Sequence, residues 1–249
     1  MPDREDGIIL CGGLGTRLRP VSDGAPKSLM TVSGRPFLEL LLGQLLRYGF
    51  DRVILATGYG ATEIRSRLGD TFGGLNLVYS VEEVPLGTGG ALRHAARHVR
   101  TTNCLVMNGD SYTGVDLAGL IRAHVETLAQ VSLVVVPSDE RGDSGSIAVD
   151  DSGRVLQFME KGGHNAQRYT NAGIYALRSP LLFDIPSDVP ISLEREVFPT
   201  WIQTGVFMKA HFHRGQCVDI GTPERYETAQ FSLADVERQA HRTDYGTRL

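Results

Sequence analysis

The stretch Ile8-Ile9-Leu10-Cys11-Gly12-Gly13-Leu14-Gly15-Thr16-Arg17-Leu18 joins a short apolar run to a glycine-rich loop. The apolar run, from Gly7 to Cys11, has the length and composition of a buried β-strand. Glycine has no Cβ atom, so the loop backbone can approach a phosphate closely and point its N–H groups toward it. Arg17 adds a guanidinium fork that matches phosphate oxygens. The stretch therefore predicts a strand that ends in an anion-binding loop, with an ordinary βα turn as the alternative.

Two better-known phosphate-binding loops do not fit this stretch. The dinucleotide-binding fingerprint requires a third glycine at the position of Leu18. The P-loop ends in Gly-Lys-Ser or Gly-Lys-Thr, and the sequence contains neither tripeptide. A nicotinamide-dependent oxidoreductase is therefore disfavoured.

Apolar, β-branched runs alternate with amphipathic segments through the first half of the chain. Strands are expected at residues 7–11, 52–57, 75–80 and 103–107, and helices at residues 36–48, 61–68 and 89–99. Strands separated by such helices require crossover connections, which predicts an α/β fold with a doubly wound, mostly parallel sheet.

The pattern changes after residue 130. Strands follow one another at residues 131–137, 145–149, 155–160 and 173–177, and helices are expected at residues 195–204 and 223–242. This order predicts an antiparallel extension of the sheet. We expect a single domain over residues 1–249, with a first part at about 1–130 and a second part at about 131–230.

Composition narrows the possible partners and location. The 249 residues carry a formal charge of −4 and contain no run of basic residues, which argues against nucleic-acid binding. The polar N-terminus lacks the features of a signal peptide, and no apolar stretch is long enough to cross a bilayer. The three cysteines, Cys11, Cys104 and Cys217, have no zinc or disulfide spacing and are predicted to be buried thiols. A cytoplasmic location is expected, whereas the oligomeric state stays open, a homo-oligomer included.

A second motif connects the glycine-rich loop to a known family. Pro26-Lys27-Ser28-Leu29 follows the loop, and the two segments together resemble the signature of the sugar-nucleotide pyrophosphorylases, which are sugar-1-phosphate nucleotidyltransferases. The resemblance covers approximately residues 7–230. It implies a nucleotide-binding part at about 1–130 and a sugar-binding part, on the acceptor side of a cleft, at about 131–230. It implies a Rossmann-like, glycosyltransferase-A-like fold with Mg²⁺ as cofactor, and a nucleoside triphosphate and a sugar 1-phosphate as substrates.

The resemblance also assigns roles to later segments. Pro85-Leu86-Gly87-Thr88-Gly89-Gly90 is similar to the second glycine loop of the family, beside the nucleotide. Asn108-Gly109-Asp110 ends a strand, where open α/β sheets bind ligands. By the resemblance, Asp110 and Asp219 hold Mg²⁺, and a hard divalent cation does prefer carboxylate oxygens. Each aspartate taken alone could equally be a turn former.

The predicted site falls into three groups of residues. The catalytic residues are Arg17, Lys27 and Asp110. The nucleotide-binding residues are Leu10, Gly12, Gly13, Gly15, Thr16, Glu82, Pro85, Gly87, Thr88, Asn108 and Gly109. The sugar-phosphate-binding residues are Glu160, Lys161, Asn171, Gly173 and Glu194. Gly162 stands where the family often has proline after the Glu-Lys pair, which puts the shape of that loop in doubt.

The implied reaction is attack of a sugar-1-phosphate oxygen on the α-phosphorus of the triphosphate. Because the attacking phosphate is already an anion, catalysis should come from positioning and from electrostatic stabilisation. Arg17 would neutralise the triphosphate, Lys27 would lie near the α-phosphate, and Lys161 would bind the acceptor phosphate.

The base and the sugar are inferred from fewer residues. Glu82 lies where relatives that use thymidine or uridine triphosphate commonly have glutamine, and a carboxylate suits the two N–H donors of guanine. Glu83 is the alternative reader, and two merely exposed acids are the other possibility.

The sequence resembles in particular the bacterial guanylyltransferases that act on D-glycero-α-D-manno-heptose 1-phosphate for surface polysaccharides such as capsule, S-layer glycan or lipopolysaccharide. Mannose 1-phosphate is the alternative acceptor, and UTP, dTTP or CTP are alternative donors. A non-catalytic nucleotide-sugar sensor is disfavoured, because Arg17, Lys27, Asp110 and Asp219 are all present.

Overall fold

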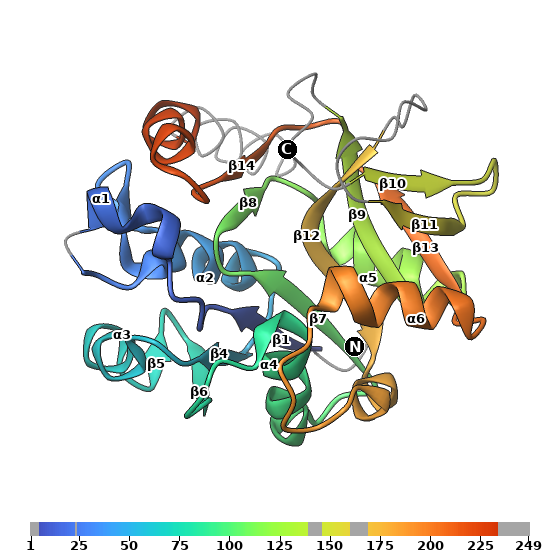
Figure 1. Ribbon diagram of the computed structural model, residues 1–249, viewed down its shortest axis with the longest axis horizontal. Helices are drawn as coiled ribbons and strands as arrows, with labels where there is room; N and C mark the ends of the chain where they lie inside the picture. The colour runs from blue at the N-terminus through green and yellow to red at the C-terminus, as the bar shows by residue number, and fades with distance from the viewer. Residues whose placement is uncertain (1–4, 23, 139–145, 160–168, 234–249) are drawn as a thin grey trace, which may run out of the picture.

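A ten-stranded mixed sheet runs through the part of the chain that the structure, a computed structural model, describes: residues 5–22, 24–138, 146–159 and 169–233. Its strand order is β11-β10-β12-β7-β1-β4-β6-β5, and β9 pairs with both β12 and β13 (Figure 1). The strands of this sheet are β1 (Asp6–Leu10), β4 (Arg52–Thr57), β5 (Thr71–Phe72), β6 (Leu75–Val81), β7 (Asn103–Asn108), β9 (Val131–Pro137), β10 (Ser146–Val149), β11 (Val155–Met159), β12 (Tyr169–Arg178) and β13 (Met208–Phe212). Two small sheets pair β2 (Thr31–Val32) with β3 (Arg35–Pro36), and β8 (Ser111–Thr113) with β14 (Cys217–Asp219).

The first half of the sheet is parallel, as the alternation of strands and helices predicts. Strand β1 pairs in parallel with β4 and β7, and β4 pairs in parallel with β6. The helices around the sheet are α1 (Arg19–Ser22), α2 (Phe37–Arg47), α3 (Ala61–Leu68), α4 (Gly87–Ala95), α5 (Leu117–Glu126) and α6 (Phe198–Gln203). Strand β4, helix α3 and strand β9 have the predicted bounds. The α/β class with a mostly parallel sheet is confirmed.

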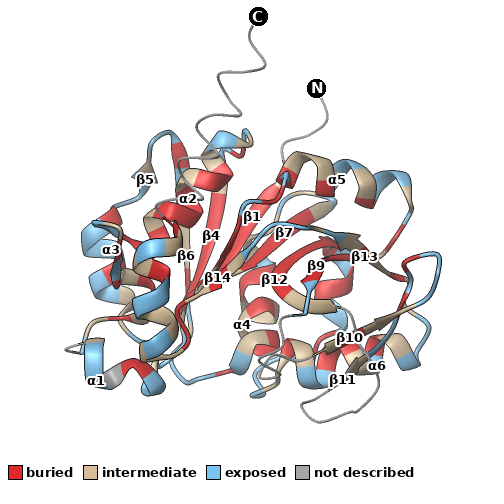
Figure 2. Cartoon of the chain, turned by 90° about the horizontal axis from the view of Figure 1, so that it is seen from above, coloured by how far each residue is buried: buried red, intermediate tan, exposed pale blue. Residues whose placement is uncertain are grey.

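Each face of the sheet packs on its own core. Ile9 belongs to a buried cluster with Leu38 and Leu41 of α2, whereas its neighbour Ile8 belongs to a second cluster with Leu92 of α4 and Phe198 of α6. Successive residues of a strand point to opposite faces, so a strand that is apolar throughout is buried on both sides. Figure 2 shows β1, β4 and β7 as buried strands in the middle of the molecule, with exposed residues on the outer sides of the surrounding helices.

The antiparallel extension belongs to the same sheet. Strand β12 pairs antiparallel with β7 on one side and with β9 on the other, and β10 pairs antiparallel with β11 and β12. Strand β13 is an exception, because it pairs in parallel with β9. The pairing of β12 with β7 joins the antiparallel extension directly to the parallel half of the sheet.

Several predicted elements differ in extent. The helix expected at residues 89–99 begins at Gly87, and a 3₁₀ turn follows it at Ala96–His98. The helix expected at residues 195–204 is a π-helical turn, Leu193–Val197, followed by α6. The strand expected at 173–177 is the longer β12, while α5, β13 and β14 were not predicted. Residues 223–233 are helical, and residues 234–242 of the predicted C-terminal helix lie outside the described residues.

Two further observations concern the membrane and the thiols. Within the described ranges, every helix is too short or too polar to cross a membrane. Cys11 and Cys104 are buried as predicted, whereas Cys217 is only half-buried, and all three are free thiols.

Candidate active site

A cavity of about 430 Å³ lies at the carboxyl ends of β1 and β7, the edge at which open α/β sheets bind ligands. We call it the first cavity. Every residue predicted to bind the nucleotide lines it, and so do the three predicted catalytic residues. Its lining residues are Leu10, Cys11, Gly12, Gly13, Leu14, Gly15, Thr16, Arg17, Lys27, Ser28, Glu82, Pro85, Gly87, Thr88, Ala91, Asn108, Gly109, Asp110 and Gly221.

Glycine is required at two points of the first cavity for steric reasons. Gly87 has φ +70°, and a Cβ atom built there would lie 2.6 Å from the carbonyl oxygen of Ile191. At Gly109 a Cβ atom would lie 2.6 Å from the carbonyl oxygen of Leu10. A side chain at either position would therefore push apart the strand ends and loops that form the cavity.

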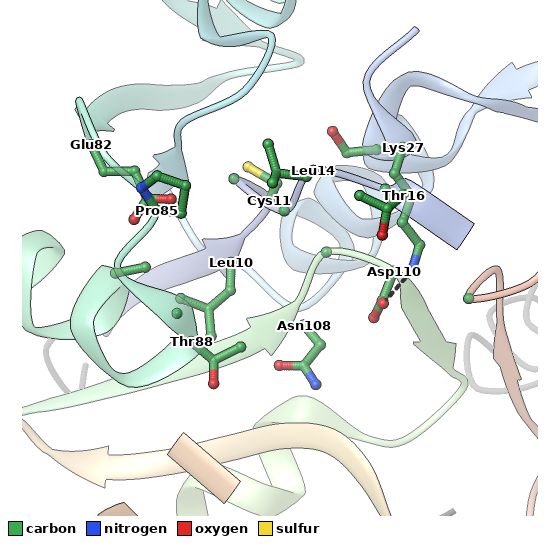
Figure 3. A pocket seen from close by; sticks show the side chains of 18 of the residues that line it. Leu10, Cys11, Leu14, Thr16, Lys27, Glu82, Pro85, Thr88, Asn108 and Asp110 are labelled. Atoms are coloured by element: carbon green, nitrogen blue, oxygen red, sulfur yellow. Dashed lines mark hydrogen bonds and ion pairs between the residues drawn. The ribbon is translucent and has the colours of Figure 1, made fainter. Parts of the chain in front are cut away.

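Lys27 and Asp110 form an ion pair in the wall of the first cavity. The Nζ atom of Lys27 lies 2.5 Å from Oδ2 of Asp110, as the dashed line in Figure 3 marks. Lys27 begins a 3₁₀ turn after Pro26, and Asp110 directly follows β7. Arg17 lies in the 3₁₀ turn Thr16–Leu18, and its side chain is exposed. The predicted catalytic cations and the carboxylate thus lie together.

Glu82 lies at the far end of the first cavity from this ion pair. Figure 3 shows Glu82 and Pro85 at one end, and Lys27 and Asp110 at the other. The Oε2 atom of Glu82 accepts a hydrogen bond from the backbone N–H of Leu86, at 3.3 Å. Burial raises the pKa of Glu82 above its usual value, and the hydrogen bond from Leu86 opposes this shift. Glu83 is exposed and is absent from the cavity lining.

A second cavity, of about 610 Å³, adjoins the first and shares Arg17, Asn108, Asp110 and Gly221 with it. Asp219 lines this second cavity, where its carboxylate accepts two hydrogen bonds from Nη1 of Arg225, at 3.2 and 3.1 Å. The pairing of β14 with β8 places Asp219 opposite Ser111, and the N–H of Ile220 donates to the carbonyl oxygen of Asp110, at 3.0 Å. The two predicted metal ligands therefore come from adjacent segments.

The donor set of these two segments has the chemistry of a magnesium site. Both side chains are carboxylates, and both are partly exposed to the cavity, at 38% for Asp110 and 30% for Asp219. No third His, Cys, Asp or Glu joins them among the described residues. Mg²⁺ commonly takes one or two carboxylates and completes its shell with waters and phosphate oxygens, so the two aspartates fit it.

Of the described residues that were predicted to bind the sugar phosphate, one lines the second cavity and two do not. Asn171 lines the second cavity. Gly173 has φ +73°, and a Cβ atom there would lie 2.8 Å from the amide nitrogen of Asn108. Glu194 lies between Thr88 and Tyr175, with hydrogen bonds of 2.9 and 3.2 Å to their hydroxyl groups. Neither Gly173 nor Glu194 is in the lining of the two cavities. Glu160 and Lys161 lie outside the described residues.

Sequence analysis did not single out three residues of this region. Arg225 and Arg214 line the second cavity, and Tyr175 is fully buried beside Glu194. Arg225 lies two residues after Pro223, at the start of the helix predicted for residues 223–242, and this place close to Asp219 was a usable signal. The position of Arg214 depends on the loop after β13, which local patterns did not predict.

Comparison with known proteins gives relatives over nearly the whole chain. The family profile described as Nucleotidyl transferase matches residues 6–236. A mannose-1-phosphate guanylyltransferase of Mycobacterium tuberculosis is 36% identical over 89% of this chain, which spans 62% of that relative's length. A D-glycero-alpha-D-manno-heptose 1-phosphate guanylyltransferase of Aneurinibacillus thermoaerophilus is 35% identical over 92% of this chain and 98% of its own length.

Two solved structures are also similar to this chain over most of its length. HddC from Yersinia pseudotuberculosis superposes with a TM-score of 0.81 and is 33% identical, over 92% of this chain and 99% of HddC. A second structure of HddC, complexed with GMP-PN, has a TM-score of 0.79 and 31% identity over the same shares of the two chains.

Proposed function

This chain belongs to the nucleotidyl transferase family and is a sugar-1-phosphate nucleotidyltransferase, and we propose that it joins GTP to D-glycero-α-D-manno-heptose 1-phosphate to give GDP-heptose and pyrophosphate. The observation that carries the choice of GTP is the half-buried carboxylate of Glu82 at the end of the first cavity away from Lys27. A nucleoside triphosphate laid along this cavity would have its base near Glu82 and its phosphates near Lys27.

The chemistry of guanine supports this assignment. The N1–H and 2-amino groups of guanine are adjacent donors, and an ionised carboxylate offers about four acceptor positions. The hydrogen bond from Leu86 uses one of these positions on Glu82, which leaves acceptors for the base. Uracil and thymine would turn carbonyl oxygens toward the same carboxylate. The relatives named as guanylyltransferases, and HddC complexed with GMP-PN, agree with a guanine nucleotide.

In the proposed reaction, an oxygen of the sugar phosphate forms a bond to the α-phosphorus of GTP while the bond to the β-phosphate oxygen breaks. The electron pair of the broken bond leaves with pyrophosphate, so no enzyme nucleophile is required. Lys27 would stabilise the charge that develops around the α-phosphorus, and Arg17 would stabilise the leaving pyrophosphate. We infer that the acceptor occupies the second cavity, because this cavity shares Arg17 and Asp110 with the first.

Nucleotidyl transferases generally use a divalent metal, and we propose that Asp110 and Asp219 hold Mg²⁺ here. Bound Mg²⁺ would supply charge neutralisation and orientation of the phosphate oxygens. The two carboxylates must exchange part of their contact with Lys27 and Arg225 for the metal. Both pairs are partly exposed, which makes such an exchange inexpensive.

The choice of acceptor rests on the relatives, whose names give two candidates. The full-length match to the Aneurinibacillus protein favours heptose 1-phosphate, whereas the mycobacterial match at 36% identity favours mannose 1-phosphate as the second candidate. We propose the heptose acceptor and a role in bacterial surface-polysaccharide synthesis. The predicted roles of Glu160 and Lys161, the cytoplasmic location and a homo-oligomer stay predictions.

A substrate matrix tests the proposed function. Purified enzyme is assayed for pyrophosphate release with each of four nucleoside triphosphates against heptose, mannose and glucose 1-phosphates, with magnesium and after chelation. We expect GTP with heptose 1-phosphate to give the highest kcat/KM and chelation to stop turnover. Faster turnover with mannose 1-phosphate would replace the acceptor, and preference for another base would refute the role of Glu82.

The substitution Glu82→Gln tests the base reader directly. Replacing one acceptor oxygen by an amide donor should lower the GTP preference by roughly tenfold or more, since a hydrogen bond to a charged group contributes about 1.5–3 kcal/mol. Glu83→Gln is the matched control, because it makes the same chemical change at an exposed neighbour outside the cavity lining. An equal loss of GTP preference in both variants contradicts the assignment to Glu82.

A further inference from the structure

Four side chains form a continuous line of hydrogen bonds between the two cavities. Thr88, which lines the first cavity, donates its hydroxyl proton to Oε2 of Glu194 at 2.9 Å. The hydroxyl group of Tyr175 donates to Oε1 of the same carboxylate at 3.2 Å. The amide nitrogen of Asn171, which lines the second cavity, donates to the hydroxyl oxygen of Tyr175 at 2.6 Å. We call these four side chains the relay.

Burial and charge fix the direction of these hydrogen bonds. Tyr175 is 0% exposed, and burial together with the nearby charge of Glu194 raises its pKa well above 10, so the phenol keeps its proton. The phenol donates its one proton to Oε1 of Glu194, so its oxygen can only accept from the amide of Asn171. The Oδ1 atom of Asn171 accepts from the N–H of Gly173 at 3.0 Å, which holds the other side of the amide.

An irregular segment of β12 makes this contact possible. Residues four apart in a regular strand lie about 13 Å apart along the strand, too far for the amide of Asn171 to reach Tyr175 easily. Here the pairing of β12 with β9 shifts register between Asn171 and Tyr175, with Gly173 at φ +73° inside the shift. Such bulges redirect side chains and are common beside active sites. Regular pairing of β12 with β9 is therefore interrupted where Asn171 and Tyr175 are brought together.

We propose that Tyr175 is a positioning residue for the acceptor: its hydroxyl group orients the amide of Asn171 in the second cavity and anchors it through Glu194 to Thr88. The inference rests on the proposed function, in which the second cavity holds the sugar phosphate. With the amide held on two sides, its second N–H and the second lone pair of Oδ1 are left to meet adjacent sugar hydroxyl groups. Glu194 thereby connects Tyr175 to Thr88 within the relay.

The substitution Tyr175→Phe tests this role, because it removes one oxygen atom and keeps the ring. The ring packs edge-on against Phe198 with centroids 5.1 Å apart, a contact that phenylalanine preserves. Kinetics are measured for both substrates, together with thermal unfolding. We expect the KM for the sugar phosphate to rise roughly tenfold while the KM for GTP stays within about twofold of wild type. A general packing defect would move both KM values together.

Tyr169→Phe is the matched control, since Tyr169 begins the same strand and packs on Phe212 instead of on the relay. A double-mutant cycle with Asn171→Ala shows whether Tyr175 affects acceptor binding through Asn171 or independently of it. If Tyr175 works through Asn171, adding Tyr175→Phe to Asn171→Ala should change the acceptor KM by less than about twofold.

Each other outcome overturns the inference. It is wrong if the two effects on acceptor KM multiply in the double variant, if the KM for GTP rises as much as that for the acceptor, or if Tyr169→Phe gives the same change. All three comparisons are made with the KM values of the wild-type enzyme. A wild-type enzyme without turnover would refute the proposed function instead, so the two failures are distinguishable.

Discussion

Replacing Lys27 by methionine distinguishes the effect of its charge on turnover from the effect on the stability of the fold. Methionine keeps an unbranched stem of similar length and removes only the charge. The Lys27 side chain is 14% exposed and that of Asp110 is 38% exposed, so the carboxylate left behind is still accessible to solvent. Asp110 also keeps the hydrogen bond from the hydroxyl group of Ser111, at 3.1 Å. The free energy of unfolding should therefore fall by only about 1 kcal/mol, or roughly 2–4 °C in Tm for a chain of this size.

The expected effect on turnover is much larger. If Lys27 stabilises charge that develops around the α-phosphorus, its loss removes an interaction that is strongest in the transition state. Losing one such fixed group typically lowers kcat by about 10²–10³, which corresponds to roughly 3–4 kcal/mol of activation free energy. Asp110→Ala should likewise abolish turnover while the protein stays folded.

The assay follows pyrophosphate release at saturating GTP and acceptor, with thermal unfolding of the same samples. Arg122→Met is the control, because it breaks an ion pair to Asp116 of 3.4 Å whose side chains are 65% and 57% exposed, outside both cavities. A Lys27→Met enzyme with kcat within about tenfold of wild type would refute the catalytic role. A similar loss of turnover in Arg122→Met would point to a general electrostatic effect instead.

Two further predictions concern the ion pair of Arg225 and the buried His124. Arg225→Gln should lower the half-saturating Mg²⁺ concentration roughly threefold or more, because it removes a cation 3.1 Å from the carboxylate of Asp219. The measurement is a magnesium titration of turnover, and a rise in the half-saturating concentration would contradict the prediction. His124 is buried and its pKa is lowered from 6.5 to about 4 by burial, so the unfolded state takes up its proton first as the pH falls. Stability should drop by about 2 kcal/mol from pH 7 to pH 5 through this group, and urea unfolding of His124→Gln should lack that drop; equal pH slopes in both proteins would exclude it.

Local patterns predicted the parallel half of the fold well because its elements depend on neighbours in sequence. The runs that became β4 and α3 carry their own periodicity, and their bounds agree with the prediction. The residues expected around the nucleotide also lie together. They follow strands whose carboxyl ends meet at one edge, so the order of strands and loops was sufficient to gather them.

The elements that sequence analysis missed depend on contacts between distant segments. Strand β13 pairs with β9, which lies more than seventy positions earlier in the chain, and β14 pairs with β8. The π-helical turn Leu193–Val197 is held by a bond from the N–H of Leu193 to the hydroxyl group of Thr88, at 2.8 Å. Helix α5 did carry a local signal, since Asp116 caps it through the N–H of Gly119, at 2.9 Å.

The junction of the two cavities explains why the charges of this site are arranged in pairs. Gly221 lines both cavities, and a Cβ atom built on it would lie 3.9 Å from Nζ of Lys27, 4.0 Å from Nη1 of Arg225 and 2.9 Å from Oδ1 of Asp219. Both cations therefore lie close to Gly221 at the junction of the two cavities, and a Cβ atom there would press only on the carboxylate of Asp219. Two unpaired lysine and arginine side chains so close together would repel each other, and Asp110 and Asp219 offset that repulsion. In the proposed reaction Asp110 and Asp219 would hold Mg²⁺, and Lys27 and Arg225 would then be available to the phosphates of the two substrates. Each of these two cations has a carboxylate partner in the absence of substrates and would gain a phosphate partner on binding.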